Sequence, residues 1–208
     1  MIKSLFVAAL FAATATAASA NVVIISGGIP GNPAENVLLN GGSSGTTISG
    51  TTNQTSSLVT FQGTESLTAP SNGQARIEAT DGAYNSLSFF LTNPSLGFTA
   101  AEFNLNAATS GNATISALDQ FGDVFTQTFA IGSNGENFFN LTSNSGEIIK
   151  QVNISTTASL SDTRQVRLGG VTAGVVPEPA AWAMMIFGMG MVGAGMRMRR
   201  RRELAATA

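Results

Sequence analysis

The sequence predicts a mainly β protein, an antiparallel β-sandwich of jelly-roll-like form, flanked by terminal segments of a different kind. Short runs of alternating apolar and polar residues recur through the central region, for example in residues 113–117. Turn-forming groups such as Asp81-Gly82 and Ser110-Gly111-Asn112 separate these runs. No central segment carries an amphipathic helical stripe. About ten short strands at this spacing are typical of sandwiches.

The first 20 residues have the three parts of a secretory signal peptide. Lys3 gives a small positive start, and an apolar stretch runs from Leu5 to Ala13. Ala18 and Ala20 place small side chains where a signal peptidase cuts, so the mature chain is expected to begin at Asn21. The apolar stretch is too short to be a permanent membrane anchor. We therefore expect the secretion machinery to export the protein.

Residues 21–174 form the predicted exported domain, which is long enough to bury a core of its own. Its ten acidic residues outnumber its four basic ones, so the formal charge of −2 for the whole chain hides an acidic domain behind a basic tail. An acidic surface argues against a nucleic-acid partner. The chain has no cysteine and no histidine. This excludes disulfides, Ser-His-Asp and Cys-His catalysis, and most zinc sites.

Within this domain, period-2 alternation predicts which side chains of each strand face inward. Two segments are rich in glycine and lack such alternation: Gly41 to Ser57, expected to be a mobile loop, and Gly169 to Gly174, expected to be a linker. The expected inward faces are Phe103 and Leu105; Ala113, Ile115 and Ala117; Phe125, Phe129 and Ile131; Ile148, Val152 and Ile154; and Val166 and Leu168.

A turn between two predicted strands holds two carboxylates, Asp119 and Asp123. Carboxylate oxygens suit a hard cation such as calcium, which makes these residues weak candidates for a calcium site. Aspartate also favours hairpin turns for backbone reasons, and no full calcium-binding loop is present. An ordinary turn is therefore the favoured interpretation, and no metal or other cofactor is expected.

The aromatic residues give little support for a sugar-binding surface. Tyr84 is the only tyrosine, and the single tryptophan lies outside the domain. Phe90 and the pair Phe138-Phe139 are the phenylalanines expected outside strand interiors, and burial of both faces is the favoured reading of the pair. Two carboxylates suffice for sugar hydrolysis, but no motif places such a pair. We expect no catalytic residues.

The carboxyl-terminal segment, residues 175–202, has three parts in a fixed order. Pro177-Glu178-Pro179 is followed by an uncharged run from Ala180 to Met196 and then by a basic cluster at 197–202. As a helix the run would span about 26 Å, the short end of what crosses a hydrocarbon core. Trp182 suits one membrane interface, and the arginines suit the cytoplasmic side. The arginines of this cluster are Arg197, Arg199, Arg200, Arg201 and Arg202.

This order of parts resembles the PEP-CTERM sorting signal, in the PEPxxWA variety of Gram-negative bacteria. The same tail is also known as the "ice-binding protein C-terminal" domain. The resemblance implies that an exosortase recognises Pro177, Glu178 and Pro179, while residues 180–196 hold the chain transiently in the inner membrane. Two prolines keep such a segment extended, as a protease cleft requires.

Taken together, these observations predict a non-enzymatic exported protein, sorted to the cell surface or released. The low charge of the β domain and its lack of catalytic residue types favour a structural or adhesive role, and the resemblance implies an association with exopolysaccharide. A carbohydrate-binding module, with or without calcium, is the alternative, and a glycan-active enzyme is the third hypothesis.

Overall fold

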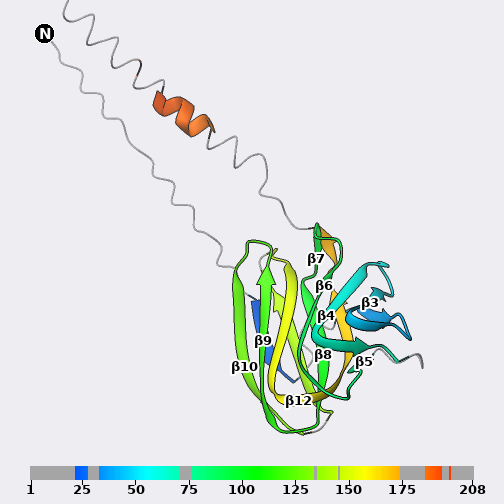
Figure 1. Ribbon diagram of the computed structural model, residues 1–208. Helices are drawn as coiled ribbons and strands as arrows, with labels where there is room; N and C mark the ends of the chain where they lie inside the picture. Colours follow the sequence, from blue (N-terminus) through cyan, green and yellow to red (C-terminus); the bar gives the residue numbers. More distant parts are fainter. Residues whose placement is uncertain are drawn as a thin grey trace, which may run out of the picture.

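The computed structural model describes residues 22–27, 33–70, 76–133, 135–144, 146–173, 186–193 and 197. Most of these residues lie in strands, and the strands of the large sheet pair antiparallel (Figure 1), so the prediction of a mainly β, antiparallel fold is confirmed. The strands are β1 (Val22–Ser26), β2 (Glu35–Leu39), β3 (Ser44–Thr52), β4 (Leu58–Thr68), β5 (Arg76–Ala79), β6 (Tyr84–Leu91), β7 (Leu96–Gly97), β8 (Ala100–Ala107), β9 (Gly111–Asp119), β10 (Val124–Ile131), β11 (Asn137–Ser143), β12 (Ile149–Gly169) and β13 (Thr172–Ala173).

The strands form two layers that β12 joins. Its first half pairs with β9 on one side and β6 on the other, and from Leu160 onward it pairs with β8. The register shifts between Ser155 and Leu160 and again between Arg164 and Arg167, and Gln165 has a φ of 53°. Such bulges bend a strand. They let one 21-residue strand leave one layer and enter the other.

β4 makes the same crossing, because its first half pairs with β6 and its end pairs with β5. The layers are thus connected on this side of the molecule. On the opposite side they end separately, one in β10 and the other in β1 (Figure 1).

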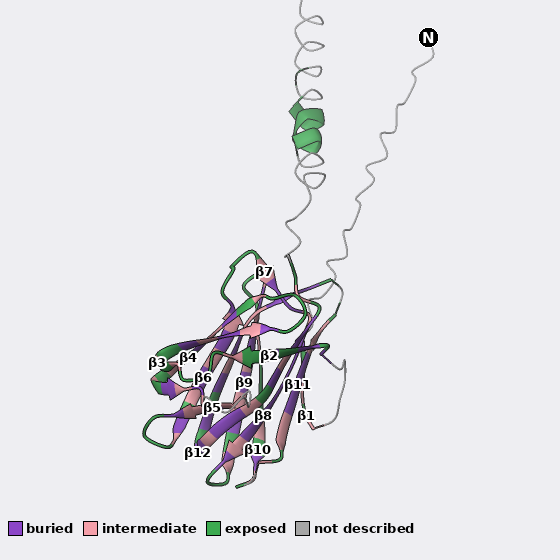
Figure 2. Cartoon of the chain, turned by 90° about the vertical axis from the view of Figure 1, so that its right-hand side faces the viewer, coloured by how far each residue is buried: buried purple, intermediate pink, exposed green. Residues whose placement is uncertain are grey.

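Aromatic rings fill the space between the layers. The ring of Phe89 on β6 lies 5.7 Å from that of Phe103 on β8, and Phe129 on β10 lies 5.4 Å from Phe139 on β11. The strands in each of these pairs are not hydrogen-bonded neighbours, so the contacts cross from layer to layer. Figure 2 colours the chain by burial: β8 is buried along nearly its whole length, whereas β10 is mostly exposed.

Most of the predicted inward faces are confirmed. Ala113, Ile115 and Ala117 are fully buried, and so are Val152 and Leu168. On β10 the prediction holds in part, because Phe125 and Phe129 are half-buried. β8 departs from simple alternation, since its polar residues Glu102 and Asn104 are buried as well.

The prediction of a mobile loop from Gly41 to Ser57 is wrong. Residues 44–52 of this segment form β3, which pairs with both β2 and β4. β-Branched threonines favour a strand, and Ile48 is buried in the core. Gly50 is needed here for close packing, because a Cβ atom would lie 2.8 Å from the carbonyl oxygen of Leu38.

The expected linker from Gly169 to Gly174 also contains structure. β12 ends at Gly169, and Thr172 and Ala173 then form β13, which pairs with β7. The pairs Thr172–Gly97 and Ala173–Leu96 therefore hold the chain against β7 until two residues before the carboxyl-terminal segment 175–202.

Residues 186–193 are helical. Among the described residues no helix reaches the length and apolar character that a membrane crossing requires. The rest of the predicted spanning segment, 180–185 and 194–196, lies outside the described residues, as does the predicted signal peptide.

Candidate functional site

The β9–β10 turn brings Asp119 into the fold and leaves Asp123 at the surface. Asp119 is buried, and its Oδ1 accepts hydrogen bonds from the backbone N–H groups of Phe121 and Asp123, each at 2.8 Å. Gly122 has a φ of +93°, which closes the turn. The Asp119 carboxylate therefore stabilises its own hairpin, as aspartate does in turns.

Two oxygens at this end of β9 have no hydrogen-bond partner although they are buried. They are Asp119 Oδ2 and Gln120 Oε1. Such oxygens could serve as calcium ligands. No group of three or more His, Cys, Asp or Glu side chains that could hold a metal occurs in the part of the chain that the structure describes. The calcium hypothesis thus stays a prediction.

A shallow groove of about 310 Å³ lies beside this hairpin, on the outer face of β6, β12 and β9. Gln151 of β12 is paired with Phe90 on one side and Leu118 on the other, so the three side chains cross the groove in a row. The remaining lining includes Thr92, Pro94, Leu96 and Lys150. We call this surface the hairpin groove.

Lys150 is held in the wall of the hairpin groove. Its Nζ donates to the carbonyl oxygens of Pro94, at 3.1 Å, and Leu96, at 3.0 Å. Partial burial lowers the pKa of Lys150 from its ordinary value. The groove therefore combines one ring, one amide and one positioned cation, a set suited to a neutral polar ligand.

Phe121 is the aromatic residue that the sequence reasoning missed. It projects from the β9–β10 turn with 59% of its surface exposed. Its position between Gln120 and Gly122, in a turn and not in a strand, could have indicated this exposure. Of the aromatics that were singled out, Phe90 and Phe138 are half-buried, and Phe139 is fully buried between the layers.

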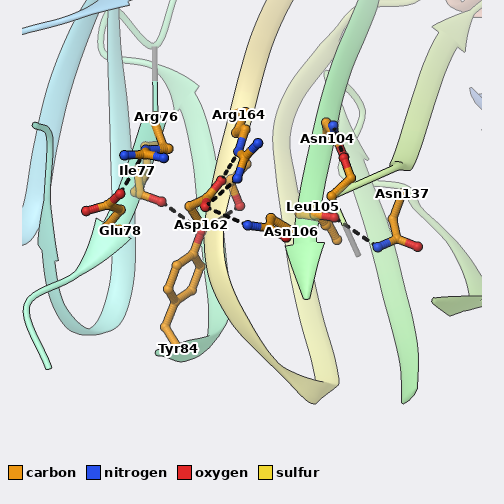
Figure 3. Close-up of polar contacts among 12 residues, drawn as sticks. Arg76, Ile77, Glu78, Tyr84, Asn104, Leu105, Asn106, Asn137, Asp162 and Arg164 are labelled. Atoms are coloured by element: carbon orange, nitrogen blue, oxygen red, sulfur yellow. Dashed lines mark hydrogen bonds and ion pairs between the residues drawn. The ribbon is translucent and has the colours of Figure 1, made fainter. Parts of the chain in front are cut away.

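A second polar cluster ties the later part of β12 to its neighbours. Asp162 is buried, and Asn106 and Arg164 both point at its carboxylate (Figure 3). Asn106 Nδ2 donates to Asp162 Oδ2 at 2.9 Å, and Arg164 uses two nitrogens. Its hydrogen bond to Asp162 raises the pKa of Arg164. Glu78, the register partner of Asp162, is paired with Arg76 at 2.8 Å.

Both carboxylates of this cluster thus hold an arginine, as structural ion pairs do. Tyr84 lies beside them with its hydroxyl 2.6 Å from Thr163 Oγ1. Burial, chiefly, raises the pKa of Tyr84. The cluster accordingly fastens β5, β8 and β12 to one another, and its groups are turned toward each other.

The site residues predicted in the two terminal segments lie outside the described residues, with the exception of Arg197. This applies to Ala18 and Ala20 of the cleavage site and to Trp182. It also applies to Pro177, Glu178 and Pro179 and to Arg199, Arg200, Arg201 and Arg202, while Arg197 is described as helical. Ala173 of β13 is the last residue before the motif that the structure describes as a strand. The candidate processing site follows the folded domain within a few residues.

Searches of the curated proteins and of the solved structures found no match to this chain. Its carboxyl-terminal segment does match a family description. Residues 175–201 carry the PEP-CTERM protein-sorting motif, the signal that an exosortase recognises, which indicates an exported protein processed at the membrane.

Proposed function

We propose that this chain is an exosortase-sorted, non-enzymatic protein that serves as a structural or adhesive component of the cell surface or the extracellular matrix, in association with exopolysaccharide. The observation that carries the proposal is the PEP-CTERM motif at residues 175–201. The lack of histidine and cysteine and the low charge of the domain support a role without catalysis. Cross-layer ring contacts support a sandwich of jelly-roll-like form.

In this proposal the signal peptide, 1–20, brings the domain across the inner membrane. Residues 180–196 then anchor it transiently, with the Pro-Glu-Pro triplet outside and the arginines in the cytoplasm. Pro177 follows Ala173 by only four residues in the sequence, so exosortase acts close to the folded domain. Cleavage frees the β domain for the surface or the matrix.

The sorting step is tested in the native host by replacing the triplet with Pro177→Ala, Glu178→Ala and Pro179→Ala together. The proposal expects the variant to stay in the inner membrane at full length, while the unaltered protein reaches the polysaccharide fraction. Glu203→Ala, outside the matched residues, is the control and should behave as the unaltered protein. Normal processing of the triple variant would refute the assignment of the triplet.

A carbohydrate-binding role is the second candidate, and the hairpin groove favours it. The groove holds Phe90, Gln151 and Lys150, and the exposed ring of Phe121 follows its lining residue Leu118 by three positions in the chain. For a calcium-assisted mode the candidate ligands are the unpartnered oxygens of Asp119 and Gln120, two residues that directly follow Leu118 of the groove lining in the chain. Aromatic rings and convergent polar groups are what sugar sites use.

A glycan array probed with and without calcium separates the two candidates. A lectin loses binding after Phe121→Ala or Gln151→Ala but keeps it after Leu38→Ala, an equally exposed residue on β2. No binding to any glycan, in either condition, leaves the matrix role as the surviving proposal.

A further inference from the structure

β10 is an edge strand whose own residues lack the features that usually protect such edges. Among the described strands it pairs with β9 alone, and it borders its layer in Figure 1. Its eight residues, Val124 to Ile131, include no charge, no proline and no glycine. Natural proteins usually blunt an edge of this length with lysine, proline or a bulge, because the free N–H and C=O groups recruit another strand.

The register with β9 shows which backbone groups of β10 are free. The N–H of Asp119 donates to the carbonyl oxygen of Asp123 at 3.0 Å, so this pair is hydrogen-bonded. Hydrogen-bonded and non-hydrogen-bonded pairs alternate along an antiparallel ladder. The odd-numbered residues of β10 therefore bond to β9. The even-numbered ones, Val124, Thr126, Thr128 and Ala130, point their N–H and C=O groups outward.

The sequence of this edge is a palindrome. Residues 125–129 read Phe-Thr-Gln-Thr-Phe, the same in both directions around Gln127. Two copies of such a strand are self-complementary when they run antiparallel, because a two-fold axis brings each residue opposite its own kind. We propose that β10 pairs with β10 of a second copy of this chain, antiparallel and centred on Gln127, to form a homodimer with a sheet continuous across the interface.

Each position in this register meets a suitable neighbour. Phe125 lies opposite Phe129 of the second copy in a non-hydrogen-bonded pair, where side chains come closest. Both rings are only half-buried in the single chain, so the pairing covers apolar surface that is otherwise wet. The outward backbone groups of the even residues supply about eight hydrogen bonds between the two strands.

The hydroxyl groups on the outer face continue the same pattern. Within the chain, Thr126 contacts Ser116 at 3.0 Å and Thr128 contacts Thr114 at 2.9 Å between hydroxyl oxygens. In the dimer Thr126 lies opposite Thr128 of the second copy, so two short hydroxyl ladders become rows four residues wide. Threonine pairs across strands are favourable.

Charge also favours the antiparallel register. Asp123 comes opposite Ile131 of the second copy, so the two Asp123 carboxylates lie at opposite ends of the interface. Parallel pairing would place them side by side, where like charges repel. Because each protomer uses the same edge, the contact closes at two copies and does not propagate into a fibre.

Cysteine cross-linking of the full-length chain in detergent micelles tests this register, since the natural chain has no cysteine. Gln127→Cys puts two thiols on the two-fold axis with Cα atoms about 4.5 Å apart, a separation that a disulfide spans. We expect most of this variant to form a covalent dimer under mild oxidation. Val124→Cys is the matched control on the same strand. Its two thiols would lie about 20 Å apart, so it should stay at background.

A mixture of Val124→Cys with Ala130→Cys should cross-link as a heterodimer, because these two positions face each other in the proposed register.

Light scattering of the unaltered chain should give a protein mass of twice 21.3 kDa, and Thr126→Lys should reduce this mass to that of one copy. A single-copy mass for the unaltered chain would overturn the proposal. Equal cross-linking of Gln127→Cys and Val124→Cys, which indicates random collision, would overturn it too.

Discussion

Tyr84 offers a direct test of how β5, β6 and β12 pack, because it is the only tyrosine in the chain. It is 2% exposed, and its hydroxyl lies 2.6 Å from Thr163 Oγ1 and 3.3 Å from the carbonyl oxygen of Ile77. Burial is the largest cause that raises its pKa, and the charges of Asp162 and Glu78 raise it further. The phenol is therefore kept neutral in the folded state.

The sign of the pH effect follows from this shift. The folded pKa lies above the unfolded value of about 10, so the stabilisation is intact below about pH 10 and declines as the pH rises toward the folded pKa. The slope is about 1.4 kcal/mol per pH unit, so roughly 2 kcal/mol is lost over the first one and a half units. Lys150 has the opposite effect on stability. Because its pKa is lowered on folding, its contribution to the free energy of unfolding increases as the pH rises toward the unfolded pKa of lysine.

The ultraviolet absorbance of tyrosinate, recorded beside circular dichroism in an alkaline titration, measures this directly. We expect the tyrosinate signal to appear only together with loss of β structure. Tyr84→Phe should remove the alkaline loss while leaving the contribution of Lys150. The same substitution should lower the free energy of unfolding at neutral pH by about 1–3 kcal/mol, because the buried Thr163 hydroxyl loses its hydrogen-bond partner. Reversible ionisation near pH 10 in a fully folded protein would refute the burial of Tyr84.

Four further substitutions test the core, β3 and the β9–β10 turn by urea unfolding. Phe89→Ala should lower the free energy of unfolding by about 3–5 kcal/mol, because three rings lie within 6.2 Å of its own. Phe121→Ala, a change at an exposed ring, should leave it nearly unchanged, and equal losses would contradict the assigned core. Gly50→Ala should cost about 1–3 kcal/mol, since its Cβ would meet backbone at 2.8 Å; no loss would show that β3 does not pack as described. Asp119→Ala should cost about 1–3 kcal/mol through two lost acceptor contacts, and an unaffected stability would refute its role in the turn.

Local alternation predicted the strands whose faces differ in polarity. Ala113, Ile115 and Ala117 on β9 are an example, because one layer covers that face and solvent meets the other. It failed where both faces are covered, as at Glu102 and Asn104 on β8. Long-range pairing decides such burial, and a period-2 pattern carries no information about it.

Length and composition misled at two other places. The Thr and Gly residues of 44–52 suggested a loop, yet pairing with two neighbours makes this segment β3. Of the single crossing strand β12, only two separate faces were predicted, around Ile154 and Val166, because buried positions between them hold polar residues such as Thr156 and Asp162. Both depend on partners distant in the sequence.

The candidate sites divide in the same way. The sorting tail could be predicted from sequence alone, because its three parts are contiguous and their order carries the signal. The hairpin groove could not be, since Phe90, Leu118 and Gln151 come together only when β6, β9 and β12 pair. The symmetry of residues 125–129 is visible in the sequence, but its meaning depends on β10 being an edge.

Mass spectrometry of the carboxyl terminus of the exported protein, isolated from the native host, tests the central claim most directly. The PEP-CTERM motif at residues 175–201 predicts a mature chain that ends at or near Pro177-Glu178-Pro179 and lacks Arg199 to Arg202. In a host without exosortase the same residues should remain attached and the chain should stay in the membrane. An exported form that still carries Arg199 to Arg202 would contradict the account.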